Sequence, residues 1–371
     1  MVMNEDYFLL SHRKEIALRA QESGYDVTIV AKNTGLRPKV EALGLKMIEL
    51  PINPTGMNLK EEWQTFRFLH HLYQTYRPDI VHHVGLKVIL WGGLAAKLTR
   101  VPAVLNAVSG LGVLFSKDPL STVAKAILRV LRFSCRRKNL CVLFQNHEDE
   151  ALFWKHKVID PAHTAFIKGS GIDLQLYAYT PEPDSDVIKV IFTARMVREK
   201  GTMILIEAAE RLRKEYQGRL EFWLCGGLSK NPKAISEAEL RACCDGKYIK
   251  WLGFRQDVHE LLMQSHIVAF PSYYREGVPK SLIEAAAVGR PIVTTDSIGC
   301  KDTVEEGYNG YLVPIKNSEV LAERLKRLID NPSLRQEMGR NSRHLAERDF
   351  DLRQVIEKHM EIYKRLLITK Q

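Results

Sequence analysis

The sequence predicts an α/β protein with two domains, each built around a parallel sheet. Short apolar runs alternate with amphipathic helical patterns along most of the 371 residues, and the series occurs twice. A chain of this length has room for two domains that each bury a core of their own. A polar, proline-rich segment without periodicity, 180–186, separates the two series and is the predicted linker.

The elements follow in order along the chain. The first series of predicted strands comprises 27–31, 46–50, 79–84, 103–108, 141–145 and 164–168. The second comprises 187–193, 220–225, 249–252, 267–270, 292–295 and 310–313, with helical stretches such as 203–216 and 321–329 between them. We therefore expect a first domain over 1–178, a second over 179–350, and a C-terminal segment over 351–371 that is largely helical.

The start of the chain departs from this pattern. A doubly wound domain should open with an apolar strand, but only Met1, Val2 and Met3 precede the polar Asn4 and Glu5. The first strand of the first domain is therefore expected to be largely missing. Either the start is truncated or misassigned, which we favour, or the first sheet lacks a central strand.

Charge is distributed unevenly over a chain with a formal net charge of +10. Residues 1–170 carry 23 Lys and Arg against 15 Asp and Glu, whereas the remainder carries 31 against 29. The excess in the first half predicts an anionic partner, such as nucleic acid, lipid headgroups or a polyphosphate. No apolar run reaches the roughly 18 residues of a membrane span, so any membrane contact should be peripheral. The six cysteines form no C-x-x-C pair, which favours the cytoplasm.

The most informative segment is 276–291, in which two carboxylates lie eight residues apart. Glu276 and Glu284 flank a Gly/Pro turn that leads into an Ala-rich helix between two apolar runs. A helix N-terminus at the carboxyl end of a strand binds anions. Carboxylates beside such a site indicate a ligand that also has hydroxyls, such as a ribose or a sugar. The alternative is a loop charge and a first-turn acid favoured by the helix dipole.

A second segment, 192–201, supplies cations. Arg195 follows a predicted strand, and Lys200 stands just before Gly201, which opens a helix. Arg offers a planar two-point donor and Lys a mobile point charge, so both could hold one diphosphate. The alternative is a solvated loop.

Together these segments resemble the retaining glycosyltransferases of family 4. The likeness rests on E-x7-E from Glu276 to Glu284, on R-x4-K-G from Arg195 to Gly201, and on the later segments 251–254 and 299–314. It implies two facing Rossmann-like domains, the GT-B arrangement, with the C-terminal helix crossing back to the N-terminal domain. Segments 109–112, 144–146, 226–232 and 271–277 are most similar to bacterial enzymes that extend lipid-linked saccharides for surface polysaccharide or glycan assembly.

The resemblance also implies roles for individual residues. Catalysis would depend on Glu276, which would hold the donor sugar, and on Arg195 and Lys200, which would hold the diphosphate. Donor binding would add Glu284 for the ribose, the turn of Gly277, Val278, Pro279, Lys280, Ser281 and Leu282, and a base-lining group of Gly253, Phe254 and Arg255. The acceptor or cleft residues would be Ser109, Gly110, Asn146, His83 and Asp173.

The expected function is transfer of a hexose or N-acetylhexosamine from a UDP-sugar to a lipid-diphosphate-linked saccharide, with retention and without metal or other cofactor. Asp184 and Asp186 mimic a metal-binding D-x-D motif, but they lie in the linker before a strand. One alternative is a sugar-nucleotide epimerase, which lacks this matched set of residues. Another is a non-enzymatic basic protein that binds membrane or nucleic acid. Nucleic-acid binding predicts aromatics among the cations, and segment 120–138 has only Phe133, so no nucleic-acid partner is expected.

Segment 120–138 is a basic amphipathic helix in the sequence. An apolar stripe includes Leu120, Leu128 and Leu131, and the cations include Arg129 and Arg132. Such a helix either lies on an anionic membrane or packs its stripe into the core. We favour the membrane, and expect a cytoplasmic protein associated peripherally with the inner membrane.

Overall fold

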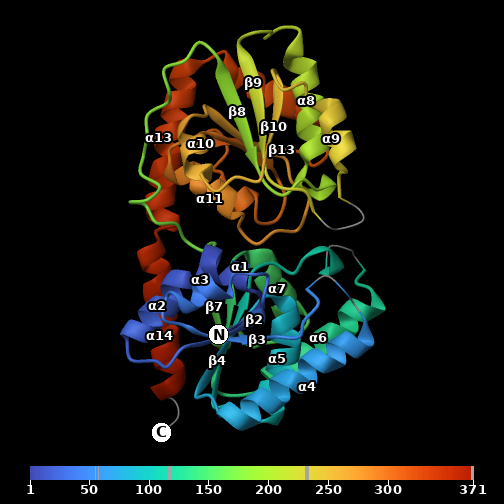
Figure 1. Cartoon of the computed structure of the whole chain (residues 1–371), viewed down its shortest axis with the longest axis vertical. Coiled ribbons are helices and arrows are strands. Elements are labelled where there is room, and N and C mark those ends of the chain that lie inside the picture. Colours follow the sequence, from blue (N-terminus) through green and yellow to red (C-terminus); the bar gives the residue numbers. More distant parts are fainter. Residues whose placement is uncertain (55, 57, 116–118, 230–233, 369–371) are drawn as a thin grey trace. The chain divides into compact units, whose positions relative to one another are not determined.

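The computed structural model divides into two compact units (Figure 1). Unit 1 comprises residues 1–170 together with the segment that starts at 353, and unit 2 comprises residues 171–352. The structure describes residues 1–54, 56, 58–115, 119–229 and 234–368, so the end of the 226–232 motif lies outside the described residues. The boundaries between the units fall at 170/171 and 352/353, compared with 178/179 and 350/351 in the sequence analysis.

Unit 1 is built on a seven-stranded parallel sheet with the order β3-β2-β1-β4-β5-β6-β7. The strands are β1 (Val2–Glu5), β2 (Thr28–Lys32), β3 (Lys46–Glu49), β4 (Ile80–Val84), β5 (Ala103–Val108), β6 (Leu140–Phe144) and β7 (Thr164–Phe166). The helices are α1 (Asp6–Phe8), α2 (Lys14–Glu22), α3 (Arg37–Glu41), α4 (Leu59–Tyr76), α5 (Leu86–Leu98), α6 (Thr122–Cys135), α7 (His147–Lys155) and α14 (Leu352–Ile368), with a π-helical turn over Leu9–Arg13 and 3-10 turns over Val113–Phe115 and Pro161–His163.

The sheet of unit 1 is covered on both faces. Successive strand residues point to opposite faces, so Val104 packs with helices α4, α5 and α6, while Leu105 packs with α2 and α14. Helices α4, α5 and α6 lie side by side (Figure 1). Burial on both faces explains why these strands are nearly continuous apolar runs in the sequence.

The first strand is short but present. Strand β1 occupies the centre of the sheet, where Val2 pairs with Val30 of β2 and with His83 of β4. The alternative that the first sheet lacks a central strand is therefore wrong. Two apolar residues are enough to form this strand because Val2 and Met3 are both buried and the strand pairs with a neighbour on each side.

Unit 2 is built on a six-stranded parallel sheet with the order β10-β9-β8-β11-β12-β13. The strands are β8 (Ile188–Thr193), β9 (Leu220–Cys225), β10 (Ile249–Gly253), β11 (Ile267–Phe270), β12 (Ile292–Thr295) and β13 (Gly310–Val313). The helices are α8 (Thr202–Arg213), α9 (Glu237–Cys243), α10 (Val258–Met263), α11 (Lys280–Ala287), α12 (Ser318–Ile329) and α13 (Pro332–Asp349), with 3-10 turns over Arg198–Lys200 and Lys301–Thr303. The two-domain parallel α/β prediction is confirmed.

Helix α6 packs its apolar stripe inward. Ala124, Leu128 and Leu131 are buried in the core of unit 1, and Ile127 packs against the same cluster. The expectation that this stripe faces a membrane is therefore corrected, because the same side chains cannot fill the core and enter a bilayer. The outer face of α6 carries exposed cations together with Val123 and Phe133, each 47% exposed.

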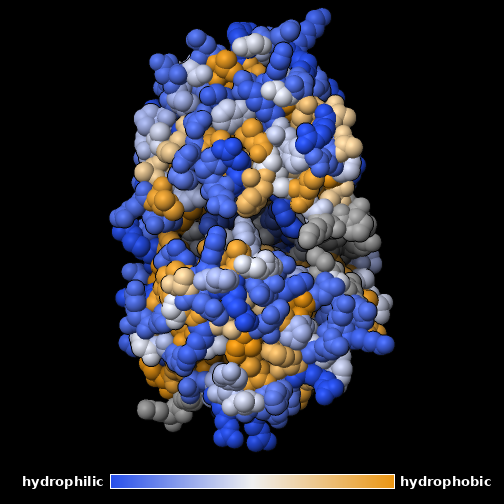
Figure 2. Space-filling view, viewed as in Figure 1, coloured by the Kyte–Doolittle hydropathy of each residue, from blue (hydrophilic) through white to orange (hydrophobic). Residues whose placement is uncertain are grey.

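Hydrophilic residues cover most of the surface visible in Figure 2 on both units. Over the part of the chain that the structure describes, no helix combines the length and the apolar character that a membrane crossing requires.

Candidate active site

The predicted donor residues of unit 2 follow two neighbouring strands at a topological switch point. The chain runs from β8 outward to β9 and β10, and then returns to the other side of β8 as β11. Arg195 and Lys200 follow β8, and Glu276 and Glu284 follow β11. Ligands of open parallel sheets bind at the carboxyl ends of the strands, in the crevice where the strand order reverses. The topology thus brings both predicted motifs to one place.

Lys200 and Glu276 are joined directly. The Lys200 ammonium forms an ion pair with Glu276 Oε1, and the two side chains are only 17% and 12% exposed. The ammonium also lies 5.5 Å from the centre of the Phe270 ring and 5.7 Å from that of Tyr274. The Ser272 hydroxyl donates to Glu276 Oε1 at 3.2 Å, which fixes the carboxylate. These contacts hold a cation and an acceptor side by side at the end of β11.

Arg195 differs from Lys200 in being exposed at the end of β8. None of the residues that the structure describes hydrogen-bonds its guanidinium. An exposed guanidinium beside a partly buried ammonium can bind an anion through two hydrogen bonds.

Two glycines allow the loops of this site to come close together. Gly201, with φ +84°, precedes α8, and a Cβ there would lie 2.0 Å from the Pro271 carbonyl oxygen. Gly299, with φ +85°, would place a Cβ 1.5 Å from the Gly277 carbonyl oxygen. Both positions require glycine for its backbone conformation and for its lack of a side chain.

Glu284 lies on the first turns of α11 and is also held. The Tyr177 hydroxyl donates to Glu284 Oε1 at 3.1 Å, and the Lys280 ammonium lies 4.0 Å from the same oxygen. The Glu284 side chain is 14% exposed. Burial raises the pKa of Glu284, while Lys280, Tyr177 and His259 act in the opposite direction.

The turn before α11 offers backbone groups rather than side chains. No side chain of a described residue caps the N-terminus of α11, whose N-cap is Pro279. The dipole of this eight-residue helix favours an anion here. Val278 is 7% exposed and Leu282 is fully buried. The Leu282 amide donates to the Pro279 carbonyl at 3.1 Å, and the role of Leu282 in donor binding stays a prediction.

The predicted base-lining residues follow β10, two strands away from β8. Gly253 has φ +68°, and Phe254 beyond it is 67% exposed. Arg255 is held by a bidentate contact to Asp257, with its Nε 2.8 Å from Oδ1. An exposed ring at the carboxyl edge of the sheet can stack on a base, which leaves Phe254 as the strongest of the three.

Two of the four predicted acceptor residues of unit 1 are buried and hydrogen-bonded within the unit. His83 is fully buried, with one ring nitrogen 2.8 Å from the Tyr73 hydroxyl and the other 2.8 Å from Asn106 Oδ1. Asn146 is fully buried and caps α7, where its Oδ1 accepts from the Asp149 amide at 2.8 Å. The polar side-chain atoms of both residues are occupied by partners inside unit 1, and their role in acceptor binding stays a prediction.

Of the remaining acceptor candidates, Ser109 and Gly110 belong to unit 1 and Asp173 to unit 2. Ser109 is exposed at the end of β5, and Gly110 follows it with φ +108°, so both remain predictions. Asp173 belongs to unit 2, where its carboxylate accepts from the amides of Gln175 and Leu176 at 2.8 and 3.1 Å. Asp173 is therefore a turn-forming residue.

Two family models match this chain. The family model described as "Glycosyl transferases group 1" matches residues 180–345, and "Glycosyl transferase 4-like" matches residues 1–146. The chain belongs to the GT-B glycosyltransferases. The family of the sequence analysis is thereby confirmed.

The relatives of this glycosyltransferase have low sequence identity to it, but the matches cover nearly the whole of each chain. It is 25% identical over 355 residues to the N,N'-diacetylbacillosaminyl-diphospho-undecaprenol alpha-1,3-N-acetylgalactosaminyltransferase of Campylobacter jejuni, covering 92% of each chain. It is 22% identical over 381 residues to the UDP-Gal:alpha-D-GlcNAc-diphosphoundecaprenol alpha-1,3-galactosyltransferase of Escherichia coli, covering 98% of this chain and 96% of the relative. Its fold matches the crystal structure of HepE from Anabaena in complex with UDP, with a TM-score of 0.76, 18% identity, and coverage of 98% and 99% of the two chains.

Sequence reasoning missed two residues that contact the candidate carboxylates of the glycosyltransferase. Ser272 contacts Glu276, and its position two residues after the apolar run 267–270 could have indicated this. Tyr177 contacts Glu284 from 107 positions earlier, and no local pattern marks it.

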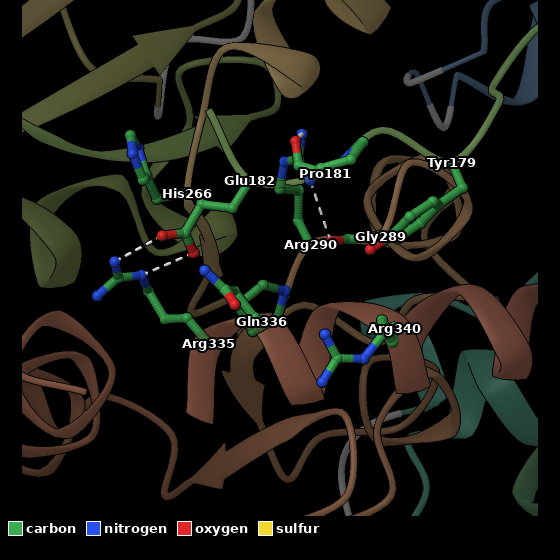
Figure 3. A pocket seen from close by; sticks show the side chains of 10 residues that line it. Tyr179, Pro181, Glu182, His266, Gly289, Arg290, Arg335, Gln336 and Arg340 are labelled. Carbon is green, nitrogen blue, oxygen red and sulfur yellow. Dashed lines mark hydrogen bonds and ion pairs between the residues drawn. The ribbon is translucent and has the colours of Figure 1, made fainter. Parts of the chain in front are cut away.

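A pocket of about 170 Å³ lies elsewhere in unit 2 of the glycosyltransferase (Figure 3). Its lining includes His266 and Pro291, which immediately precede β11 and β12, so it belongs to the amino ends of the strands. Arg335 pairs with Glu182 there at 2.9 and 2.6 Å. Since the candidate donor residues follow the carboxyl ends, this pocket is separate from them.

Proposed function

We propose that the glycosyltransferase moves a sugar, with retained anomeric configuration, from a UDP-sugar to a lipid-diphosphate-linked saccharide in bacterial surface polysaccharide or glycan assembly. The observation that carries the proposal is the pairing of Lys200 with Glu276 beside Arg195 at the switch point of unit 2. A cation pair for a diphosphate and a carboxylate for hydroxyls are the groups that a nucleotide-sugar donor needs.

The relatives support the choice of substrates. Both enzymes named above carry a diphosphate-linked undecaprenol saccharide in their names, and the E. coli enzyme is named for UDP-Gal. The HepE structure contains UDP. Family membership favours glycosyl transfer over the epimerase alternative, which lacks this set of residues.

In the proposed reaction, Arg195 and Lys200 neutralise the charge that develops on the departing diphosphate, together with the N-terminus of α11. The Lys200 ammonium has three N–H donors, so it can contact Glu276 and a phosphate oxygen together. Glu276 accepts hydrogen bonds from the donor sugar, and Glu284 accepts them from the ribose. Ser109 and Gly110 belong to the acceptor side. We propose that the reaction needs no metal and no other cofactor.

We further propose that unit 1 docks reversibly on an anionic membrane through the outer face of α6 and the residues after it. This face carries Lys125, Arg129, Arg132 and Arg136, all exposed, with Phe133 among them. Each cation near an anionic surface contributes about 1 kcal/mol. Several cations together give association that salt weakens, which suits an enzyme with a lipid-linked acceptor.

The test of the reaction is a panel of UDP- and GDP-sugars, each measured for hydrolysis and for transfer to an undecaprenyl-diphosphate saccharide. Rapid release of one sugar from UDP, with an α product from an α donor by NMR, is the expected result. Release from none of the donors, or an inverted product, would contradict the proposal. Strong binding of nucleic acid without donor hydrolysis would favour the non-enzymatic alternative.

A further inference from the structure

Tyr177 links the candidate ribose carboxylate to a distant part of unit 2. Its hydroxyl donates to Glu284 Oε1 at 3.1 Å. The edge of its ring meets the ring of His259 on α10, with 6.1 Å between the ring centres and 70° between their planes. Tyr177 is half-buried, and its side chain contacts neighbours through both its hydroxyl and its ring.

The backbone on both sides of Tyr177 is held by arginines. Arg343 of α13 donates to the Tyr177 carbonyl at 2.8 Å, and also to the Leu174 and Ala287 carbonyls at 3.3 and 2.9 Å. Arg290, which is 1% exposed, donates to the Thr180 carbonyl at 2.7 Å. Arg335 then pairs with Glu182 (Figure 3). These hydrogen bonds hold segment 174–182 against helices α11 and α13, and they fix the position of the Tyr177 backbone.

The two oxygens of Glu284 are used differently. Oε1 accepts from Tyr177 and lies 4.0 Å from the Lys280 ammonium. Within the described residues, none donates a hydrogen bond to Oε2. The hydrogen bond from Tyr177 to Oε1 restricts rotation of the carboxylate. The carboxylate therefore loses less conformational freedom when Oε2 accepts a hydrogen bond from a ligand.

We propose that Tyr177 is a positioning residue that presents Glu284 to the ribose hydroxyls of the donor nucleotide. This inference rests on the proposed function, since it requires a nucleoside diphosphate in this site. The ligand class is a ribonucleoside diphosphate with an intact 2',3'-diol. Tyr177 makes the site selective for ribose over deoxyribose without contacting the sugar itself.

The experiment compares the wild type with Tyr177→Phe and a matched control, Tyr216→Phe. Tyr216 also donates its hydroxyl to a carboxylate of unit 2, Asp330, at 2.7 Å, but it lies at the far end of α8. Calorimetry gives the Kd of UDP, GDP, ADP and CDP for the wild type. The tightest of these is then compared with its 2'-deoxy and 3'-deoxy forms for all three proteins.

We expect the wild type to bind the ribonucleotide about 10-fold or more tighter than at least one deoxy form. Tyr177→Phe should lose most of that ratio, because its ribonucleotide Kd rises about 5- to 20-fold while its deoxy Kd stays nearly constant. Tyr216→Phe should keep the full ratio. In steady-state assays, Tyr177→Phe should raise the donor KM by a similar factor and leave kcat within about twofold.

Three outcomes would overturn the inference. If Tyr177→Phe kept the wild-type ratio, Tyr177 would have no positioning role. If its affinity fell equally for the ribo and deoxy forms, or if Tyr216→Phe behaved alike, the effect would be one of general stability. If the wild type bound none of the four diphosphates, the proposed function would fail and this inference with it, which separates that result from the first two.

Discussion

Lys200 and Glu276 neutralise each other in a place where each alone would be costly. Their side chains are 17% and 12% exposed, so removing one partner leaves a partly buried charge without its counter-ion. The Ser272 hydroxyl and the ring of Tyr274 complete their surroundings. In the proposed reaction, a diphosphate would meet a cation that is already oriented, so little reorganisation would be needed for catalysis.

Alanine substitutions at Arg195, Lys200 and Glu276 should each lower turnover about 10- to 100-fold. A charge-assisted hydrogen bond contributes about 1.5–3 kcal/mol, and more if it strengthens in the transition state. Sugar release from the nucleotide donor measures the effect, with circular dichroism to check the fold. Arg198→Ala is the matched control, because Arg198 pairs with Glu239 at the exposed tip of the same loop. Near-normal activity of Arg195→Ala and Lys200→Ala would refute the diphosphate site.

Glu284→Gln should weaken nucleotide binding but stabilise the fold at pH 7. Burial raises the pKa of Glu284, so the ionised side chain costs stability at neutral pH. That cost disappears once the pH falls below the ordinary value of 4.5, where the carboxyl is protonated in both the folded and the unfolded chain. Urea unfolding at pH 7 and pH 4 tests this, with the exposed Glu260→Gln as control. An unchanged or lower stability of Glu284→Gln at pH 7 would contradict the expectation.

Local spacing was enough to predict some of these residues and not others. Arg195 and Lys200 lie in the loop that follows strand β8, and Glu276 lies in the loop that follows β11, so the parallel topology places the two loops at the same edge of the sheet. Tyr177 contributes through a contact across 107 positions, which no local pattern encodes. His83 and Asn146 also stand at or near strand ends, but side chains that face a helix are buried, and the sequence alone does not give that direction.

Most strands were predictable because burial on both faces makes them short apolar runs. Strand β11, over Ile267–Phe270, has the predicted bounds, and so do β12 and β13. Strand β1 was not predictable, since two apolar residues are too few to indicate a strand. Its place at the centre of the sheet depends on pairing with β2 and β4 on either side.

Strand β4 makes unit 1 sensitive to acid. Burial lowers the pKa of His83 from 6.5 to about 4, because the charged ring would lose its hydration. The resulting stability is complete above pH 6.5 and is lost as the pH falls toward 4, by about 3 kcal/mol from this residue. Urea unfolding measured from pH 7 to pH 4 should show that the free energy of unfolding falls less steeply in His83→Gln than in the wild type. The free energy of unfolding of His71→Gln, a change at an exposed histidine, should fall as steeply as that of the wild type. An equal pH dependence in all three proteins would show that His83 does not cause the loss of stability in acid.

Helix α6 can be tested through its outer face alone. Changing Arg129, Arg132 and Arg136 to Glu should release the protein from anionic vesicles and slow transfer to a lipid acceptor. Hydrolysis of the donor should be nearly unchanged, because its residues belong to unit 2. Arg137 is excluded, since its guanidinium donates to the Val101 carbonyl.

The control for this helix reverses three exposed cations on other elements of unit 1, Arg19, Lys39 and Lys46. That variant should bind vesicles more tightly than the α6 variant. Equal binding by the two variants would show that overall charge, rather than α6, determines association.

Each unit repeats one plan, in which strand order reverses beside the first strand of its sheet. In unit 2 the reversal lies between β8 and β11, and in unit 1 between β1 and β4. The alternation of strands and helices predicted two parallel sheets with crossover helices but not the strand order, and the identity of the sugar depends on side chains that no periodicity reveals. The fold of the molecule was therefore more predictable from the sequence than its choice of donor sugar.

Activity should survive a chelator. In the proposed reaction, Arg195, Lys200 and the N-terminus of α11 would supply the positive charge that a metal would otherwise provide. Sugar release in excess EDTA, compared with release in added manganese, measures this. Complete loss that manganese restores would contradict the expectation and would point to Asp184 and Asp186, which are exposed before β8.

Unit 2 begins and ends at neighbouring points of the backbone. The Ile172 amide donates to the Phe350 carbonyl at 2.8 Å, and the Leu352 amide donates to the Ile172 carbonyl at 3.0 Å. Unit 2 is therefore one continuous stretch of the chain, residues 171–352, and backbone hydrogen bonds join its two ends. Unit 1 resumes at residue 353. A single exchange of coding sequence could replace residues 171–352, which carry the proposed donor site, with the same part of a relative, while unit 1 would keep its strands and helix α14.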